Sequence, residues 1–324
     1  MWYLPATILL SAVVSIETLH PVATVKIGKT ADWVAPTPDA VWVGSTGPNA
    51  VHRIDPRTNT EAATVPLSGE PCAGLVTGFG SLWVPLCQAQ PERSGGNPEK
   101  RQWRDAGKPA LARVDLATNR LQSVFNVGTA AECGIAASDD SLWLVTDPAA
   151  GSLARIDPAT GAVRQRVSLP AGSCNPHFSA GIVWVTNAKG AELTAVAADT
   201  GAIVATIATG PHPRFLTDGA NSIWTFNQGD GSVTRVDIAT RRATASVPLK
   251  TPGPGGDIAF GADIIWTTMP KTPLSATAVQ TNTVLRQWHG PGGDSLAVAH
   301  GAIWLTDYHK GTITRLRLEE ASAR

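Results

Sequence analysis

A tryptophan inside a short apolar run recurs seven times along the chain, and this repeat constrains the fold more than any other feature. The intervals between successive tryptophans are 41, 60, 41, 40, 42 and 38 residues. Self-similarity at about 40 residues, with several short strand-like runs per unit, is typical of propeller blades. The seven positions are Trp42, Trp83, Trp143, Trp184, Trp224, Trp266 and Trp304. The sequence therefore predicts an all-β chain that forms a seven-bladed β-propeller with four-stranded blades.

Charge and composition exclude some partners. Lys plus Arg and Asp plus Glu number 26 each, so the chain has no basic field that would attract nucleic acid. Gly (31) and Pro (24) punctuate the apolar runs, as many short strands require. We expect no nucleic-acid partner, and we expect a monomer.

The third unit shows the four strands of a blade most clearly. Small residues at 134–137 suit a strand close to a crowded axis, and 141–145, around Trp143, suit a bulky second strand. Residues 153–157 form the third strand, and 163–169 alternate apolar with polar side chains as a half-exposed outer strand does. The Arg-x-Asp phrase of the third strand recurs in other units, for example at Arg113 and Arg235, which indicates a structural role.

The two ends of the chain are predicted to share one blade. The last unit ends after its third strand, whereas residues 22–28 read as an outer strand that precedes the first inner strand. We therefore expect this N-terminal strand to complete the last blade and close the ring, which removes exposed sheet edges. Residues 21–318 form one propeller, with an insertion at about 88–109 in blade two and a tail at 319–324.

The N-terminal residues 1–20 include an apolar stretch at 4–16, which is too short to span a membrane comfortably. It reads as an export signal or, alternatively, as an apolar tail on a cytosolic chain. Four cysteines without metal-ligand spacing favour an oxidising compartment. We expect a periplasmic or secreted protein with no membrane span in the mature chain.

The cysteines are predicted to brace loops on one face of the ring. Cys72 enters the inner strand of blade two and Cys87 leaves the next strand at the same end, which predicts a Cys72–Cys87 disulfide. Cys133 and Cys174 lie in equivalent loops of blades three and four, so either a second disulfide or two free buried thiols would fit.

A candidate binding site follows from counting back nine to eleven residues from each tryptophan, to the loops that enter the inner strands near the axis. Residues there differ from blade to blade, as the walls of a ligand pocket do. His177, Arg214 and Glu132 are candidate base, anion clamp and acid, or else ordinary channel-lining groups. The expected ligand-binding residues, some from the loops after the second strands, are Trp33, Asn187, Asn227, Gln228, Asp307 and His309.

Three carboxylates in adjacent blades are candidate metal ligands. Asp257, Asp294 and Asp32 belong to blades six, seven and one, and converging carboxylates repel unless they are solvated, protonated or bridged by a cation. Oxygen ligands of this kind suit Mg²⁺ or Ca²⁺. The alternative is that each Asp caps a glycine-rich turn and accepts backbone N–H bonds.

The blade phrases Ser141-Leu142-Trp143-Leu144-Val145-Thr146 and Ala154-Arg155-Ile156-Asp157-Pro158 resemble the exported bacterial propellers of the YVTN-repeat and virginiamycin B (streptogramin) lyase-like group. The resemblance covers about residues 22–318 and implies an extracytoplasmic seven-bladed propeller. It also implies Pro-His-(Gly/Ala)-Ile phrases in late blades, whose histidines act with Mg²⁺ in lyases. Here those places read Gly256-Asp257-Ile258 and Asp294-Ser295-Leu296, so the usual catalytic histidine pair is absent.

Two functions remain open from the sequence. The first is a binding module that holds a small polar ligand or a protein partner on the axial face. The second is an enzyme, a metal-assisted lyase or lactone hydrolase, in which Asp32, Asp257 and Asp294 hold the cation and His177 is the general base.

Overall fold

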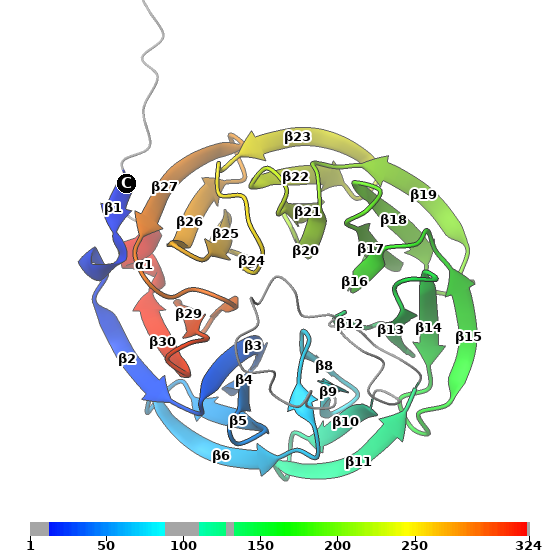
Figure 1. Cartoon of the computed structure of the whole chain (residues 1–324), viewed down its shortest axis with the longest axis horizontal. Helices are drawn as coiled ribbons and strands as arrows, with labels where there is room; N and C mark the ends of the chain where they lie inside the picture. The colour runs from blue at the N-terminus through cyan, green and yellow to red at the C-terminus, as the bar shows by residue number, and fades with distance from the viewer. Residues whose placement is uncertain (1–12, 88–109, 128–132, 323–324) are drawn as a thin grey trace, which may run out of the picture.

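A computed structural model describes residues 13–87, 110–127 and 133–322 of the chain. Seven sheets, each built on antiparallel strands, stand around a central axis in sequence order (Figure 1). The expected seven-bladed propeller is therefore confirmed. Glu132 and the insertion at 88–109 lie outside the described residues.

The strands occupy four concentric positions in the ring. The innermost strands are β3 (Thr30–Thr37), β7 (Glu70–Pro71) with β8 (Val76–Gly78), β12 (Ile135–Ala137), β16 (Ser173–Ser179), β20 (Pro213–Gly219), β24 (Asp257–Gly261) and β28 (Leu296–Ala299). The second strands are β4 (Ala40–Thr46), β9 (Ser81–Cys87), β13 (Leu142–Asp147), β17 (Ile182–Asn187), β21 (Ser222–Asn227), β25 (Ile264–Met269) and β29 (Ala302–Asp307).

The third strands are β5 (Ala50–Asp55), β10 (Ala110–Asp115), β14 (Ser152–Ile156), β18 (Glu192–Ala197), β22 (Ser232–Asp237), β26 (Thr272–Ala278) and β30 (Thr312–Arg317). The outer strands are β6 (Thr60–Pro66), β11 (Arg120–Asn126), β15 (Val163–Ser168), β19 (Ile203–Ala208), β23 (Arg242–Pro248), β27 (Thr283–His289) and β2 (Pro21–Lys26).

The ring closes as the sequence predicts. The N-terminal strand β2 pairs antiparallel with β30 and becomes the outer strand of blade seven. A further strand, β1 (Val13–Ser15), adds to the outer edge of blade six in parallel with β27, which the sequence did not predict. A single turn of 3-10 helix (Ile16–Thr18) joins β1 to β2, and the short helix α1 (Leu318–Ser322) follows β30. Among the described residues, no helix is long and apolar enough to cross a membrane.

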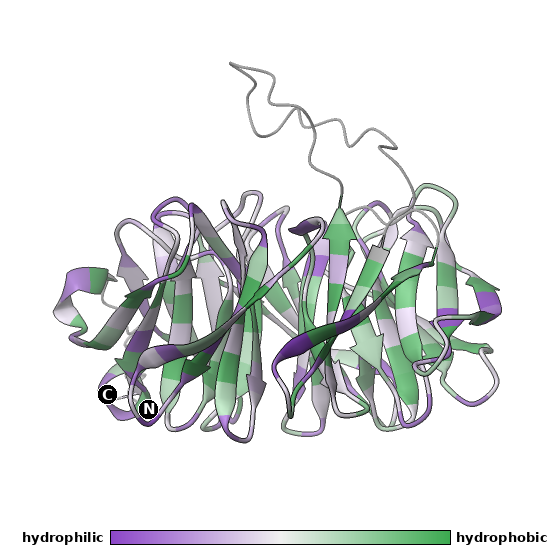
Figure 2. Ribbon diagram, turned by 90° about the horizontal axis from the view of Figure 1, so that it is seen from below, coloured by the Kyte–Doolittle hydropathy of each residue, from purple (hydrophilic) through white to green (hydrophobic). Residues whose placement is uncertain are grey.

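The core lies between the blades. Seven clusters of buried apolar side chains each combine residues of two neighbouring sheets, and the one that joins blades seven and one contains Trp304 and Val41. Figure 2 shows the apolar colouring concentrated along the strands and the polar residues at the turns of both faces. Burial between sheets is the interaction that fixes blade number and closure.

The repeated tryptophans are structural. All seven are 0–1% exposed. In five blades the indole N–H donates to the backbone carbonyl five residues earlier, as Trp224 does to Gly219 at 3.2 Å. In four blades the arginine of the third strand covers the indole face, as Arg235 does at 5.0 Å from the Trp224 ring. The Arg-x-Asp phrase therefore recurs because it packs on the tryptophan and caps the following turn.

Candidate functional site

The axial face of the ring contains a cavity of about 770 Å³. Its walls are the loops that enter the inner strands and the loops that follow the second strands, in blades one, two, five, six and seven. The lining includes Trp33, Phe215, Arg214, Asp294, Asp307 and His309. A second cavity of about 180 Å³ lies further along the axis and is lined by His177, Asn175 and Asp257 among others. Trp33 and Phe215 border both cavities.

A layer of unlike residues, one from each blade, lines the smaller cavity. Its members stand nine residues before the blade tryptophans: Trp33, Gly74, Gly134, Asn175, Phe215, Asp257 and Ser295. The rings of Trp33 and Phe215 come from blades one and five and lie 6.1 Å apart between centroids, tilted by 53°. Gly74 lies below the Trp33 indole, whose Cε3 is 4.0 Å from where a Cβ on this glycine would be. A Cβ at this position would be in ordinary van der Waals contact with the ring.

β-bulges aim several of these side chains at the axis. The pairing register slips between Asp32 and Val34, so Trp33 is the extra residue of its strand and adopts a left-handed backbone with φ of +57°. Asn175 is in the same situation in blade four, with φ of +36°. The left-handed region costs a non-glycine residue about 1–2 kcal/mol. Backbone conformations of this cost concentrate at binding and catalytic sites.

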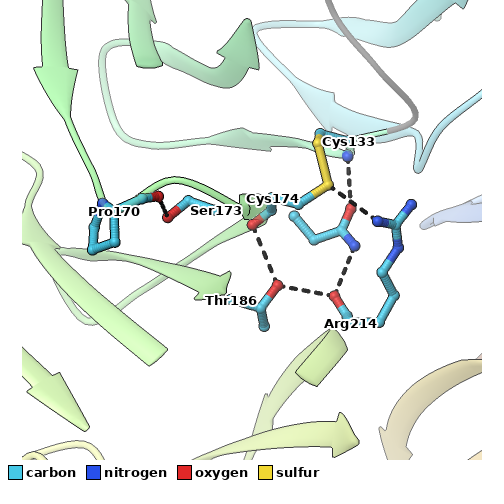
Figure 3. The surroundings of a disulfide bond; sticks show 8 residues. Cys133, Pro170, Ser173, Cys174, Thr186 and Arg214 are labelled. Carbon is cyan, nitrogen blue, oxygen red and sulfur yellow. Dashed lines mark hydrogen bonds between the residues drawn. A yellow bond between two sulfur atoms is a disulfide. The ribbon is translucent and has the colours of Figure 1, made fainter. Parts of the chain in front are cut away.

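Hydrogen bonds join the layer from blade to blade. The Asn175 side-chain oxygen accepts from the Gly134 N–H at 2.7 Å, and its amide donates to the Arg214 carbonyl at 2.7 Å. Figure 3 shows Thr186 donating to the same carbonyl, while a guanidinium nitrogen of Arg214 lies 3.5 Å from the sulfur of Cys174. Arg214 also covers the Phe215 ring at 5.8 Å. The expected anion clamp therefore lies in the wall of the larger cavity, stacked on its aromatic floor.

Both disulfides form at this face. Cys72 is bonded to Cys87, and Cys133 to Cys174. The first joins the inner and second strands of blade two, and the second joins blades three and four beside Arg214. The alternative of free thiols for the second pair is therefore wrong.

Asp257 and Asp294 lie next to each other where blade six meets blade seven. The Asp257 carboxylate accepts from the Ser295 hydroxyl at 2.7 Å and from the backbone N–H groups of Ile258 and Leu296. Burial raises the pKa of Asp257 to about 6. Burial, and then the neighbouring charge of Asp257, raise the pKa of Asp294 to about 6. The backbone N–H of Gly256 hydrogen-bonds Asp294 and opposes this rise.

Asp32, the third candidate metal ligand, lies at the β-bulge of blade one. Its carboxylate oxygen accepts from the Trp33 N–H at 2.7 Å and so holds the bulge. Across the described ranges, no group of three or more His, Cys, Asp or Glu side chains is arranged to hold a metal ion. Asp32 and Asp257 do accept backbone N–H bonds, as the turn-capping alternative expects.

The remaining candidate residues divide into two groups. Gln228, Asp307 and His309 line the larger cavity. Asn187 and Asn227 are buried inside their blades, where Asn187 accepts from the Gly190 N–H and Asn227 donates to Ser232 and Thr234. Neither asparagine is among the described residues that line the two cavities.

His177 has a partner that the sequence did not reveal. Its Nε2 lies 2.8 Å from a carboxylate oxygen of Asp218 in blade five, and the Ser179 hydroxyl donates to the other oxygen at 3.0 Å. The His177 hydrogen bond lowers the pKa of Asp218. His177 lines the smaller cavity, whereas Asp218 is not among its lining residues.

One sequence signal points to the carboxyl pair directly. The pentapeptide Gly-Pro-Gly-Gly-Asp occurs at 253–257 and again at 290–294, each time in the loop that enters an inner strand. Phe215, in contrast, has no such signal, because an aromatic residue in an inner strand also fits the core.

Comparison with known proteins supports the fold alone. No protein-family model and no curated protein matches the chain. Among solved structures, the crystal structure of BamB from Moraxella catarrhalis superposes with a TM-score of 0.63 and 13% sequence identity, over 93% of this chain and 98% of that one. The resemblance to the YVTN-repeat and streptogramin lyase-like group stays a prediction.

Proposed function

We propose that this chain is an exported binding propeller that holds a small polar ligand in the larger axial cavity. The observation that carries the proposal is the convergence of unlike residues from five blades on that cavity, with Trp33 and Phe215 as an apolar floor and Arg214, Asp294 and Asp307 as polar walls. A cavity of about 770 Å³ is within the range of small-molecule sites, which are mostly apolar with a few placed polar groups.

The proposed location outside the cytoplasm rests on the two disulfides. Structural disulfides persist in oxidising compartments and are rare in the cytosol. Both bonds also brace loops of the axial face, which would keep the cavity preformed.

A ligand-observed NMR screen of a fragment library against the full chain tests the proposed site. Fragments that bind in the cavity should lose their signal change with Trp33→Ala, because the substitution removes half of the aromatic floor. Ile203→Ala is the matched control, since Ile203 is an apolar side chain that is 47% exposed on an outer strand. If no fragment binds, or if the hits are insensitive to Trp33→Ala, the proposed site is wrong.

The enzyme alternative retains one supporting observation, the His177–Asp218 dyad. A carboxylate that holds an imidazole at 2.8 Å fixes its orientation and supports general-base chemistry. The proposed metal-assisted reaction also needs a cation on Asp257, Asp294 and Asp32. Thermal melting in a titration with Mg²⁺ or Ca²⁺ tests this, because a bound cation raises the melting temperature. An unchanged melting temperature would remove the metal-assisted enzyme.

A further inference from the structure

The repeated pentapeptide gives blades six and seven two loops of the same shape, here called the twin loops (residues 253–257 and 290–294). Their three glycines have φ of +143°, +89° and +81° in the first loop and +146°, +94° and +84° in the second. Only glycine adopts such a series without strain. Each loop ends on the aspartate of the carboxyl pair, Asp257 or Asp294, so the same local structure is built twice and delivers two acids to one place.

No basic side chain neutralises this pair within the part of the chain that the structure describes. Neither Asp257 nor Asp294 takes part in an ion pair with Lys, Arg or His. His309 acts on Asp294 only as a favourable neighbouring charge, and Asp307 opposes it. Asp307 has its own partner, Lys310, at 3.2 Å. The two half-buried carboxyls therefore form no ion pair with a cation of the described residues.

A buried hydroxyl beside the twin loops also lacks a partner. Thr268 is fully buried, and its hydroxyl makes no hydrogen bond among the described residues. The hydroxyl oxygen lies 2.4 Å from where a Cβ on Gly293 would be, so it faces the second loop directly before Asp294. An unsatisfied buried polar group of this kind is uncommon in a folded protein.

We propose that the ligand of the axial cavity carries an ammonium group, which Asp294 binds with Asp257 behind it, while the apolar part of the ligand lies on Trp33 and Phe215. This inference rests on the proposed function and names its ligand class. An ammonium group donates charge-assisted hydrogen bonds to the carboxylates of the pair. The adjoining aromatic faces also attract cations. The ligand thus supplies the cation that the described part of the chain does not pair with these two carboxyls.

An anionic ligand fits this wall less well. Of the cations that line the cavity, Arg214 of blade five already lies over the Phe215 ring and against Cys174, whereas the Asp294 wall repels anions. A divalent metal would lack a third acidic, His or Cys ligand among the described residues. A single ammonium group needs only one or two carboxylates.

Three probes of one shape test the proposal: phenethylamine, 2-phenylethanol and 3-phenylpropanoate, titrated calorimetrically into the full chain at pH 7.5. We expect phenethylamine to bind at least tenfold more tightly than the alcohol, and the carboxylate to bind most weakly. Asp294→Asn should remove that preference without abolishing binding of the alcohol, while Trp33→Ala should weaken all three. Asp263→Asn, an exposed turn substitution in blade six, is the matched control.

Measuring the affinity at several pH values distinguishes the effect of the carboxyl pair from that of neighbouring charged groups. Phenethylamine affinity should rise between pH 5 and pH 7, because the ammonium group binds the ionised carboxyl pair. Binding at low pH must therefore displace a proton from the carboxyl pair. His309→Gln is measured in parallel, because other charged groups also face this cavity, namely His309, Asp307, Lys271, Arg214, Asp32 and Glu70. The rise should persist in that variant and disappear in Asp294→Asn.

The results distinguish the two proposals. If the alcohol binds as tightly as the amine, or the carboxylate binds best, and Trp33→Ala weakens that binding, the ammonium proposal is wrong and the cavity proposal stands. If the amine binds but Asp294→Asn has no effect, the ammonium site is also refuted. If the fragment screen finds no ligand for the cavity and none of the three probes binds, both proposals fail.

Discussion

The Asp257→Asn substitution should destabilise the protein at low pH and stabilise it at neutral pH. The folded state raises the pKa of this carboxyl from 3.8 to about 6, so it holds the proton more tightly than the unfolded chain does. The resulting contribution is present below about pH 4, is lost as the pH rises through about 6, and is constant above that. A shift of about 2 units corresponds to about 3 kcal/mol, at about 1.36 kcal/mol per unit.

An asparagine side chain does not ionise, so the variant has no carboxyl contribution to lose as the pH rises. It also has one hydrogen-bond acceptor oxygen fewer than the carboxylate. Asp257 uses one oxygen for the Ile258 N–H and the other for Ser295 and Leu296, and an amide can accept at only one of them. The lost hydrogen bond costs about 1 kcal/mol at any pH. Asp257→Asn should therefore be less stable than wild type by about 1 kcal/mol near pH 3 and about as stable at pH 4.5, where about 1 kcal/mol of the contribution is already lost. At pH 7.5 it should be up to about 2 kcal/mol more stable than wild type.

Urea unfolding of both proteins at four values of pH between 4.5 and 7.5 measures this difference. Asp263→Asn serves as the control, because it removes an exposed carboxyl from a turn of the same blade. The coupled partner adds a second observable: without the charge of Asp257, the pKa of Asp294 should fall, which carbon-detected NMR of the carboxyl groups can follow. A stability difference between Asp257→Asn and wild type that stays the same across this range would refute the reasoning.

Three further results are expected. Replacing both cysteines of a disulfide with serine should lower the free energy of unfolding, by about 3 kcal/mol for Cys72–Cys87 and about 4 kcal/mol for Cys133–Cys174. The second loss is larger because its cysteines are 41 residues apart in sequence, compared with 15 for the first pair. Urea melts measure both losses, and equal, negligible losses would show that loop closure does not matter. Trp224→Ala should cost about 3–5 kcal/mol in the same assay and Trp33→Ala clearly less, because only Trp224 is fully buried. Ile16→Ala should speed amide exchange in β27, since Ile16 packs against the start of the second twin loop; unchanged exchange would show that β1 is held by other contacts.

The sequence predicted those features that repeat. The blade count, the closing strand at β2 and the position of the pocket face all follow from the spacing of the tryptophans, because each blade must solve the same packing problem. The features that break the repeat were harder to interpret. Asn187 and Asn227 were expected in the pocket, but they occupy equivalent positions at the ends of second strands. Asp147 and Asp307 accept a backbone N–H three residues later at that same position, as Asn187 does, so recurrence indicates a turn role there.

Contacts between blades could not be predicted from spacing. Asp218 contacts His177 because blades four and five converge on the axis. The two residues are 41 positions apart in sequence, and no sequence pattern indicates their contact. Trp33 meets Phe215 across the ring for the same reason. The parallel strand β1 was missed because a three-residue strand has too short a pattern to recognise.

Fluorine NMR of the chain labelled with 5-fluorotryptophan tests the central claim most directly, namely that function lies at the residues that break the repeat. Substituting Trp33 identifies its resonance, and phenethylamine is then added to the wild-type chain. The account predicts that the Trp33 resonance shifts in a saturable way while those of the seven buried blade tryptophans stay in place. A saturable shift in the blade tryptophans with Trp33 unchanged would contradict it.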